Sequence, residues 1–203
     1  LHYIGNDFLF EYPFRCRGVL TAEQAMNKLL HDVQIQSFVW NKMYKRSLFT
    51  DYGITYPSIA FEDTATTNRL FAHANKVAVI DRPLYYYNQR PMSTLATMNV
   101  TKINDYLRAV ASVRASLEEN GIYGKFQKSY AALVHRAFNF SCMYVLRMHR
   151  DNKNARGFLT NISRVSRATK YFAGDGFNSG LVRGGMFNIV LEPQKLEEDY
   201  SVR

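Results

Sequence analysis

The two adjacent carboxylates Glu62 and Asp63 are the residues of this sequence best suited by type and position to chemistry. They open a predicted helix over residues 62–74, where acidic side chains are favourable partners for the positive end of the helix dipole. For the pair taken alone, that structural explanation is sufficient. A carboxylate beside a cleft can also act as a general base and remove a proton from an attacking hydroxyl group. The helix dipole keeps such a group ionised, while burial restores its basicity.

The other residue types that could bind a metal ion or act as a nucleophile have no supporting spacing. The five histidines form no HExxH motif, the two cysteines form no CxxC pair, and no GxSxG motif occurs. Gly174 and Gly176 lack the third glycine of a dinucleotide-binding loop. We therefore expect no metal site and no disulfide framework in these residues. Two isolated thiols suit a reducing, cytoplasmic compartment.

Two segments on either side of the acidic pair could contribute to a binding site. Segment 38–49 holds the only tryptophan, and segment 83–94 holds three consecutive tyrosines followed by a loop. The polar or aromatic residues that could contact a ligand are Trp40, Asn41, Lys42, Arg90 and Ser93. A tryptophan alone is typical of a core residue, and three tyrosines are typical of a half-buried strand. An arginine and a serine leaving a strand can bind phosphate or simply end the strand in water.

The order Trp-Asn-Lys, then Glu-Asp, then Leu-Tyr-Tyr-Tyr-Asn-Gln-Arg-Pro-Met-Ser resembles the C-terminal half of bacterial family-2-type glycosyltransferases of the GT-A fold. These are inverting enzymes that use nucleotide sugars to build surface polysaccharides. The resemblance runs over residues 38–94. It includes Gly-Ile-Thr-Tyr-Pro at residues 53–57, which is similar to the family's Gly-Ile-x-Phe-Pro entry to the helix that carries the acidic pair.

The resemblance implies a role for each matched residue. Asp63 matches the catalytic base, which deprotonates the acceptor hydroxyl as it attacks the anomeric carbon, and Glu62 matches a partner that orients an acceptor hydroxyl or tunes the base. The residues implied to border the acceptor site are Trp40, Asn41 and Lys42. The residues implied to contact the donor diphosphate are Arg90 and Ser93.

The sequence departs from the family in its first residues. The family's N-terminal half supplies a nucleotide-binding sheet and an Asp-x-Asp metal motif, whereas Asp7 stands alone here. We therefore expect the chain to be a fragment with a cut N-terminal end. In the full-length enzyme, Mg²⁺ or Mn²⁺ and the nucleotide of the donor are expected to bind to the missing half. The fragment by itself is expected to be inactive.

Periodicity and turn signals predict a mixed α and β fold. Helices are expected at residues 21–30, 41–49 and 62–74, strands at 76–80 and 84–88, and helices through most of 99–172. The predicted domain organisation is the acceptor-side half of a GT-A domain (1–98), a basic helical appendage (99–172) and a loose, Gly-rich and acidic tail (173–203).

The net charge of +9 is concentrated in one stretch of the chain. Residues 121–172 hold ten Lys and Arg residues but a single acidic residue, Asp151. Such a block attracts phosphate groups of lipids or nucleic acids, or it is a solvated helix face. We expect it to bring the enzyme to the cytoplasmic face of an anionic membrane that carries a lipid-linked acceptor. No apolar run approaches the roughly 20 residues of a membrane span.

A non-catalytic function is the alternative. In that hypothesis the helices of residues 99–172 bind anionic lipid or nucleic acid, and Glu62 and Asp63 only begin a helix. No RNA- or DNA-binding motif occurs in the sequence, so nucleic acid is not expected as a partner of the glycosyltransferase.

Overall fold

The computed structural model describes residues 2–4, 9–11, 16–80, 82, 84–88, 92–150 and 155–183. The strands are β1 (His2–Ile4), β2 (Leu9–Glu11), β3 (Gly18–Thr21), β4 (Lys76–Val79) and β5 (Tyr86–Asn88). The helices are α1 (Ala22–His31), α2 (Ser47–Thr50), α3 (Glu62–Ala72), α4 (Val100–Glu119), α5 (Tyr123–His149), α6 (Ala155–Ala173) and α7 (Ser179–Arg183). The predicted mixture of helix and strand is confirmed.

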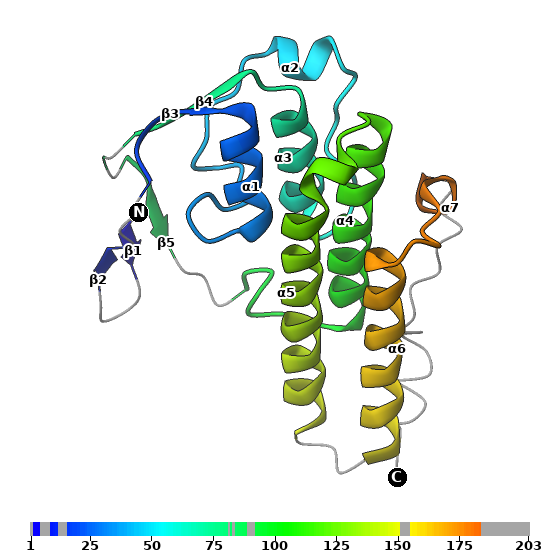
Figure 1. Ribbon diagram of the computed structural model, residues 1–203. Coiled ribbons are helices and arrows are strands. Elements are labelled where there is room, and N and C mark those ends of the chain that lie inside the picture. The colour runs from blue at the N-terminus through cyan, green and yellow to red at the C-terminus, as the bar shows by residue number, and fades with distance from the viewer. Residues whose placement is uncertain are drawn as a thin grey trace.

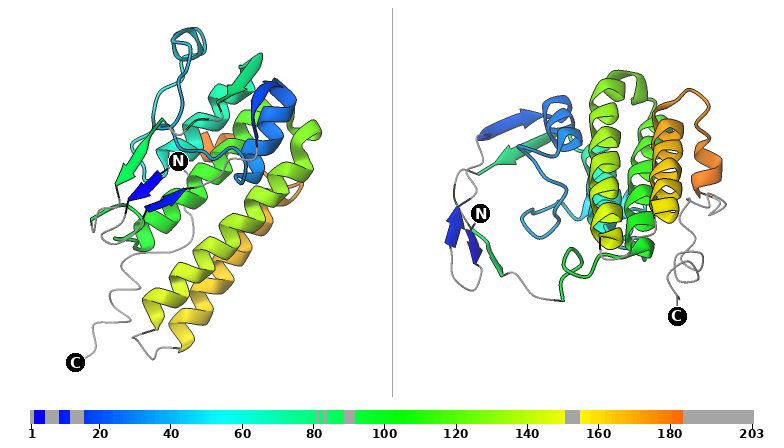
Figure 2. Two further views of the ribbon diagram at one scale, coloured as in Figure 1. Left: turned by 90° about the vertical axis from the view of Figure 1, so that its left-hand side faces the viewer. Right: turned by 90° about the horizontal axis from the view of Figure 1, so that it is seen from below.

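The strands gather at one edge of a helical body (Figure 1). Helix α3 packs against α1 and α4, and α5 packs against α1, α4 and α6. The pair formed by α5 and α6 extends past the ends of α1 and α3, and α7 lies on the side opposite the strands (Figure 2). Helix α3, which carries the acidic pair, therefore lies inside the helical body.

The strands form two small sheets. In the first, β1 pairs antiparallel with β2 and parallel with β5, so that Tyr3 lies opposite Phe10 and Tyr87. In the second, β3 pairs antiparallel with β4. The predicted strands at residues 76–80 and 84–88 are confirmed as β4 and β5. They belong to different sheets, however, so the turn between them does not form a hairpin.

Local capping signals explain where the helices begin and end. Thr21 and Gln24 form a capping box at the start of α1, with each side chain accepting a hydrogen bond from the other's backbone N–H. The Asn99 side chain caps α4 by accepting a hydrogen bond from the Lys102 N–H. Gly121, at φ +66°, separates α4 from α5 in a conformation that favours glycine. The predicted helical region after residue 99 is confirmed.

One hydrophobic core joins the first and second predicted domains. It combines side chains of α1, α3, α4, α5 and α6, including Met26, Phe71, Leu107, Tyr130 and Phe172. The core therefore continues across the predicted boundary between residues 98 and 99. The helices after this boundary stabilise the elements before it.

The predicted helix at residues 41–49 is wrong for most of its length. Only α2, four residues long, is helical there, and residues 35–46 form an irregular segment. The Lys42 ammonium explains this path, because it donates hydrogen bonds to the carbonyl oxygens of Gln36 and Phe38. The chain curves around this cation instead of forming helical hydrogen bonds.

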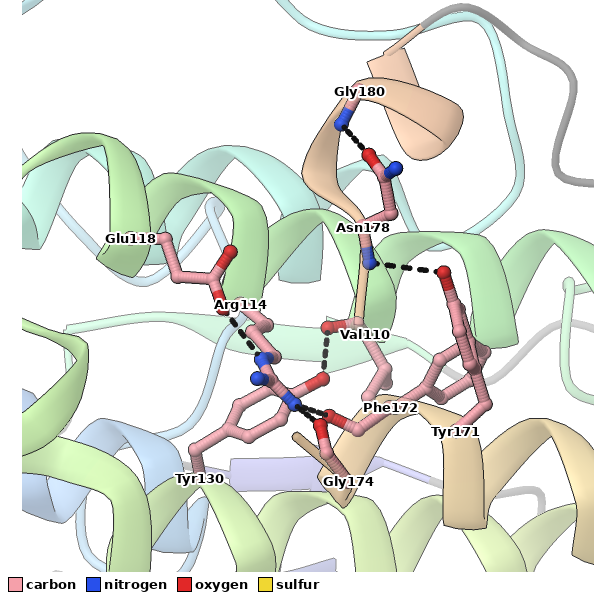
Figure 3. A network of polar contacts seen from close by, with 9 residues as sticks. All are labelled: Val110, Arg114, Glu118, Tyr130, Tyr171, Phe172, Gly174, Asn178 and Gly180. Atoms are coloured by element: carbon pink, nitrogen blue, oxygen red, sulfur yellow. Dashed lines mark hydrogen bonds and ion pairs between the residues drawn. The ribbon is translucent and has the colours of Figure 1, made fainter. Parts of the chain in front are cut away.

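A buried arginine connects α4 to the end of α6 (Figure 3). Arg114 is 4% exposed and donates from Nε to Glu118 at 2.8 Å. Its Nη1 donates to the carbonyl oxygens of Phe172 and Gly174, both at 2.6 Å. The guanidinium carbon lies 4.3 Å from the ring centre of Tyr123 and 4.5 Å from that of Phe177. Arg114 thus satisfies carbonyl groups that a helix end leaves without partners.

Replacing Arg114 with methionine is expected to lower the free energy of unfolding by about 3 kcal/mol, because two carbonyl groups lose a charged donor. Urea denaturation followed by circular dichroism measures this change. The matched control is Arg167→Met, which removes an exposed arginine of α6 and is expected to change stability by less than about 0.5 kcal/mol. Equal losses in both variants would contradict the structural role of Arg114.

A candidate acid–base site at the start of α3

Helix α3 begins at a strained residue. Phe61 adopts the left-handed conformation (φ +63°, ψ +32°), which costs a bulky residue about 1–3 kcal/mol. Its ring is held 4.8 Å from the ring of Tyr106 and 5.8 Å from that of Phe140. The aromatic core therefore fixes the backbone turn that directs Glu62 and Asp63 into the first turn of α3.

The Asp63 carboxyl group is largely buried and is poised to ionise near neutral pH. Burial raises the pKa of Asp63 to about 6, and the negative charge of Glu62 acts in the same direction. Its Oδ1 atom accepts a hydrogen bond from the Thr64 N–H at 2.7 Å, which opposes the rise. A carboxylate with such a pKa is a stronger base than an exposed one and is still ionised at pH 7.

The positive charge that acts on Asp63 comes from the irregular segment. Lys42 donates to Oδ1 of Asn41 at 2.8 Å, in addition to its two backbone carbonyl acceptors. Burial lowers the pKa of Lys42 to about 8, while Asp32 and then Asp63 favour its charged form. Lys42 therefore provides a partly desolvated cation within electrostatic range of Asp63.

Hydroxyl groups attach the same segment to α3. Tyr44 OH lies 3.3 Å from Thr67 Oγ1, and Thr67 Oγ1 donates to the Ser37 carbonyl at 2.8 Å. Burial raises the pKa of Tyr44 to about 12, with a smaller contribution from Asp63. Burial also raises the pKa of Tyr106, and Asp63 contributes there as well. Asp63 thus lies within electrostatic range of two phenols that stay neutral at physiological pH.

The ion pair between Asp32 and Arg136 was not predicted from the sequence. Asp32 follows α1 at φ +51°, and its Oδ2 lies 2.7 Å from Arg136 Nη1. Oδ1 of Asp32 accepts from Ser37 N–H at 2.9 Å. Burial raises the pKa of Asp32, whereas Arg136 and the Ser37 N–H lower it, and the net direction is upward. Asp32 and Arg136 are 104 residues apart, so no local sequence pattern indicates this pair.

Trp40 joins the irregular segment to β5. Its ring stacks 4.8 Å from Phe38 and 4.9 Å from Tyr87, and it lies 4.5 Å from the tilted ring of Tyr85. The indole is therefore packed against rings of its own chain. Tyr85 is 39% exposed and presents the accessible part of this aromatic cluster.

The structure brings together, to different degrees, the three motifs that carry the resemblance: Trp-Asn-Lys, Glu-Asp and the tyrosine-rich segment 83–94. Lys42, which is hydrogen-bonded to Asn41, lies within electrostatic range of Asp63, and Trp40 packs against Tyr85 and Tyr87. Arg90 lies outside the described residues. The Ser93 hydroxyl accepts a hydrogen bond from Ala96 N–H at 3.3 Å, and its carbonyl accepts one from Thr97 N–H, so Ser93 stabilises a turn.

The described part of the chain contains no group of three His, Cys, Asp or Glu residues that could hold a metal ion. Comparisons of the chain with models of protein families, with curated proteins and with solved structures each find no match.

The burial of Asp63 predicts a pH dependence of stability. In the unfolded chain this carboxyl ionises near its ordinary pKa of 3.8, whereas the folded protein retains the proton up to about pH 6. The raised pKa therefore stabilises the folded state fully at a pH below 3.8, the pKa in the unfolded chain. This stabilisation is lost as the pH rises through about 6, the pKa in the folded protein. Relative to Asp63→Asn, the wild type is expected to lose about 2 kcal/mol of unfolding free energy between about pH 4 and pH 6.5.

Urea denaturation of both proteins across this pH range measures the difference. Asp51→Asn, which removes an exposed carboxylate, is the matched control and should follow the wild-type curve. Parallel curves for wild type and Asp63→Asn would show that the carboxyl group of Asp63 ionises as it does in the unfolded chain.

Proposed function

We propose that this chain is the acceptor side of an inverting glycosyltransferase of the GT-A type. The enzyme transfers a sugar from a nucleotide-sugar donor to a glycan or lipid-linked acceptor in surface polysaccharide synthesis. The observation that carries the proposal is the largely buried Asp63 carboxyl group within electrostatic range of Lys42. The contacts of Thr67 with Tyr44 and with the Ser37 carbonyl hold the segment of the Trp-Asn-Lys motif against the helix that begins with the Glu-Asp motif. The contact of Trp40 with Tyr87 brings the third motif to the same segment.

In the proposed reaction Asp63 acts as the general base. Its carboxylate takes the proton of an acceptor hydroxyl while that oxygen attacks the anomeric carbon of the donor. The bond from the anomeric carbon to the nucleotide diphosphate breaks on the opposite side, so the configuration inverts and the diphosphate leaves with the bonding electrons. Glu62 accepts a hydrogen bond from the acceptor, and its charge helps to keep Asp63 basic.

Lys42 and the aromatic cluster have positioning roles in this proposal. The Lys42 ammonium, held by three oxygen acceptors, favours the ionised form of Asp63 in a buried place. The exposed ring surface of Tyr85, supported by Trp40, suits the apolar face of an acceptor sugar. The described residues offer no ligand set for Mg²⁺ or Mn²⁺, so no step is assigned to an ion in this chain.

The sheet is compatible with a larger domain. Strands β1 and β5 are parallel, and parallel neighbours require a long crossover, which residues 5–85 provide here. We propose that the nucleotide-binding half, with the metal ion and most donor contacts, is formed by residues outside this sequence. Arg90, whose type suits a diphosphate, remains a proposed donor contact.

An anionic membrane is the proposed partner of the helical part. Along one face of α5, Lys125 pairs with Glu23, Ser129 donates to Asn27, and Arg136 pairs with Asp32. The same face continues beyond α1, where its members are exposed: Met143, Leu146, Arg147 and Arg150. Among the described residues, no helix is both long and apolar enough to cross a membrane. A mixed basic and apolar face suits binding at the membrane surface.

Sedimentation with vesicles tests this partner. The chain is expected to bind vesicles rich in phosphatidylglycerol and not neutral phosphatidylcholine vesicles at low salt. The double variant Leu146→Ser, Arg147→Gln should weaken binding by about fivefold or more, because it removes one apolar and one basic contact. Lys45→Gln, on the irregular segment, is the matched control for charge. Equal binding to both vesicle types would contradict the proposal.

The general base is tested by Asp63→Asn in a polypeptide that joins this chain to its nucleotide-binding half. The rate of sugar transfer is expected to fall by about 10²-fold to 10⁴-fold, with the KM for the donor little changed, because the variant loses proton abstraction only. Radiolabelled sugar incorporation measures the rate. Asp51→Asn is the control and should retain the rate within about twofold.

A normal transfer rate in Asp63→Asn would remove this residue from the mechanism. Retained membrane binding in a chain that shows no sugar transfer with any nucleotide sugar would favour the alternative, a non-catalytic basic module for anionic lipid or nucleic acid. The concentration of basic residues in 121–172 is the observation that supports that alternative.

A further inference from the structure

A cavity of about 440 Å³ lies on the other side of α3 from the acid–base site. Ala65 and Arg69 of α3 line it, one turn apart, whereas Asp63 and Thr67 occupy the opposite face of the helix. Helix α4 contributes Arg108 and Ser112, and the remaining walls come from residues 55–59 and from Val182 of α7. The volume falls in the range of about 300–1,000 Å³ that is typical of small-molecule sites.

The two arginines of the cavity are held differently. Arg108 lies 3.3 Å from Asp105, whose other carboxylate oxygen accepts from Ala60 N–H at 3.1 Å. Arg69 is half-buried and has no hydrogen-bonding or ion-pairing partner among the described residues. Its electrostatic neighbour is His73, and burial together with Arg69 lowers the pKa of that imidazole. The Arg69 guanidinium therefore lacks a counter-charge at the wall of a cavity.

The rest of the lining indicates what kind of anion fits. Thr55 provides a hydroxyl group, while the Ser112 hydroxyl already donates to the Ala109 carbonyl at 2.7 Å and can only accept from a ligand. Ile59, Ala65 and Ala111 supply apolar walls for a carbon skeleton. Two guanidinium groups against one carboxylate leave an excess positive charge, which attracts an anionic group to the cavity.

We infer that this cavity binds a small phosphate monoester, with its phosphate on Arg69 and Arg108 and its carbon skeleton against the apolar wall. The geometry of guanidinium groups matches phosphate oxygens, and a phosphate monoester carries close to two negative charges at neutral pH. The site does not include Asp63, so the inference does not depend on the proposed glycosyl transfer. A bound ligand would connect α3, α4 and α7.

Isothermal titration calorimetry of the full chain with glycerol 3-phosphate and glucose 6-phosphate tests this inference. Saturable binding of at least one of them is expected, and Arg69→Gln should weaken it by about tenfold or more. Arg108→Gln changes a side chain that is 46% exposed, so it should fold normally and also weaken binding. Arg167→Gln removes the same charge from the exposed face of α6 and should leave the affinity within about twofold.

Three results would overturn the inference. One is the absence of saturable binding by both phosphate esters. Another is an equal loss of affinity in Arg69→Gln, Arg108→Gln and Arg167→Gln, which would assign the effect to overall charge. The third is equal or tighter binding of citrate, which would show that the cavity selects carboxylates. If Arg69→Gln is unfolded by circular dichroism, the comparison of Arg108→Gln with Arg167→Gln decides.

Discussion

The arrangement of charges around α3 depends on one constraint, the burial of the Asp63 carboxyl group. A buried carboxylate is costly unless opposite charge or hydrogen bonds compensate it. Here the compensation forms a chain of alternating sign, from Arg136 to Asp32, to Lys42 and to Asp63. These four charges sum to zero, and Glu62 adds a negative charge at the outer end. Asp63, which lies between Lys42 and Glu62 in this series, therefore takes up a proton more readily than an exposed aspartate does, which is the property of a base.

The helices after residue 99 are part of this arrangement. Helix α5 supplies Arg136, which anchors the chain of charges, and Phe140, which holds the strained Phe61 ring. Helix α4 supplies Tyr106, whose ring packs against both aromatic residues. A division into an acceptor-side half and an appendage follows the sequence resemblance, but the acid–base site requires both parts. The conformation of the first turn of α3 is consequently set by residues that are distant in sequence.

The sequence predicted well those features that local interactions determine. Helix α1 has its capping box and apolar face within ten residues, and α4 and α5 have long helical periodicity. The path of residues 35–46 could not be predicted, because two kinds of contact override the local helical preference. The Lys42 ammonium binds carbonyl groups four and six residues earlier in its own segment, and Tyr44 contacts Thr67 of α3. The pair of Asp32 and Arg136 spans 104 residues and had no local signal. The pairing of β5 with β1 instead of β4 is likewise a long-range choice.

The basic residues of 121–172 differ in what their side chains contact. Lys125 and Arg136 pair with carboxylates of the same molecule, so they help to hold α5 against α1. The face of α5 that carries them passes beyond α1 and there presents Met143 and Arg147 to solvent. Since this helix face contacts α1 along its first half and is free of α1 along its second, the second half is the part that an external molecule can reach. The position of a charge on this helix, more than the total charge of the segment, therefore determines which partner it can bind.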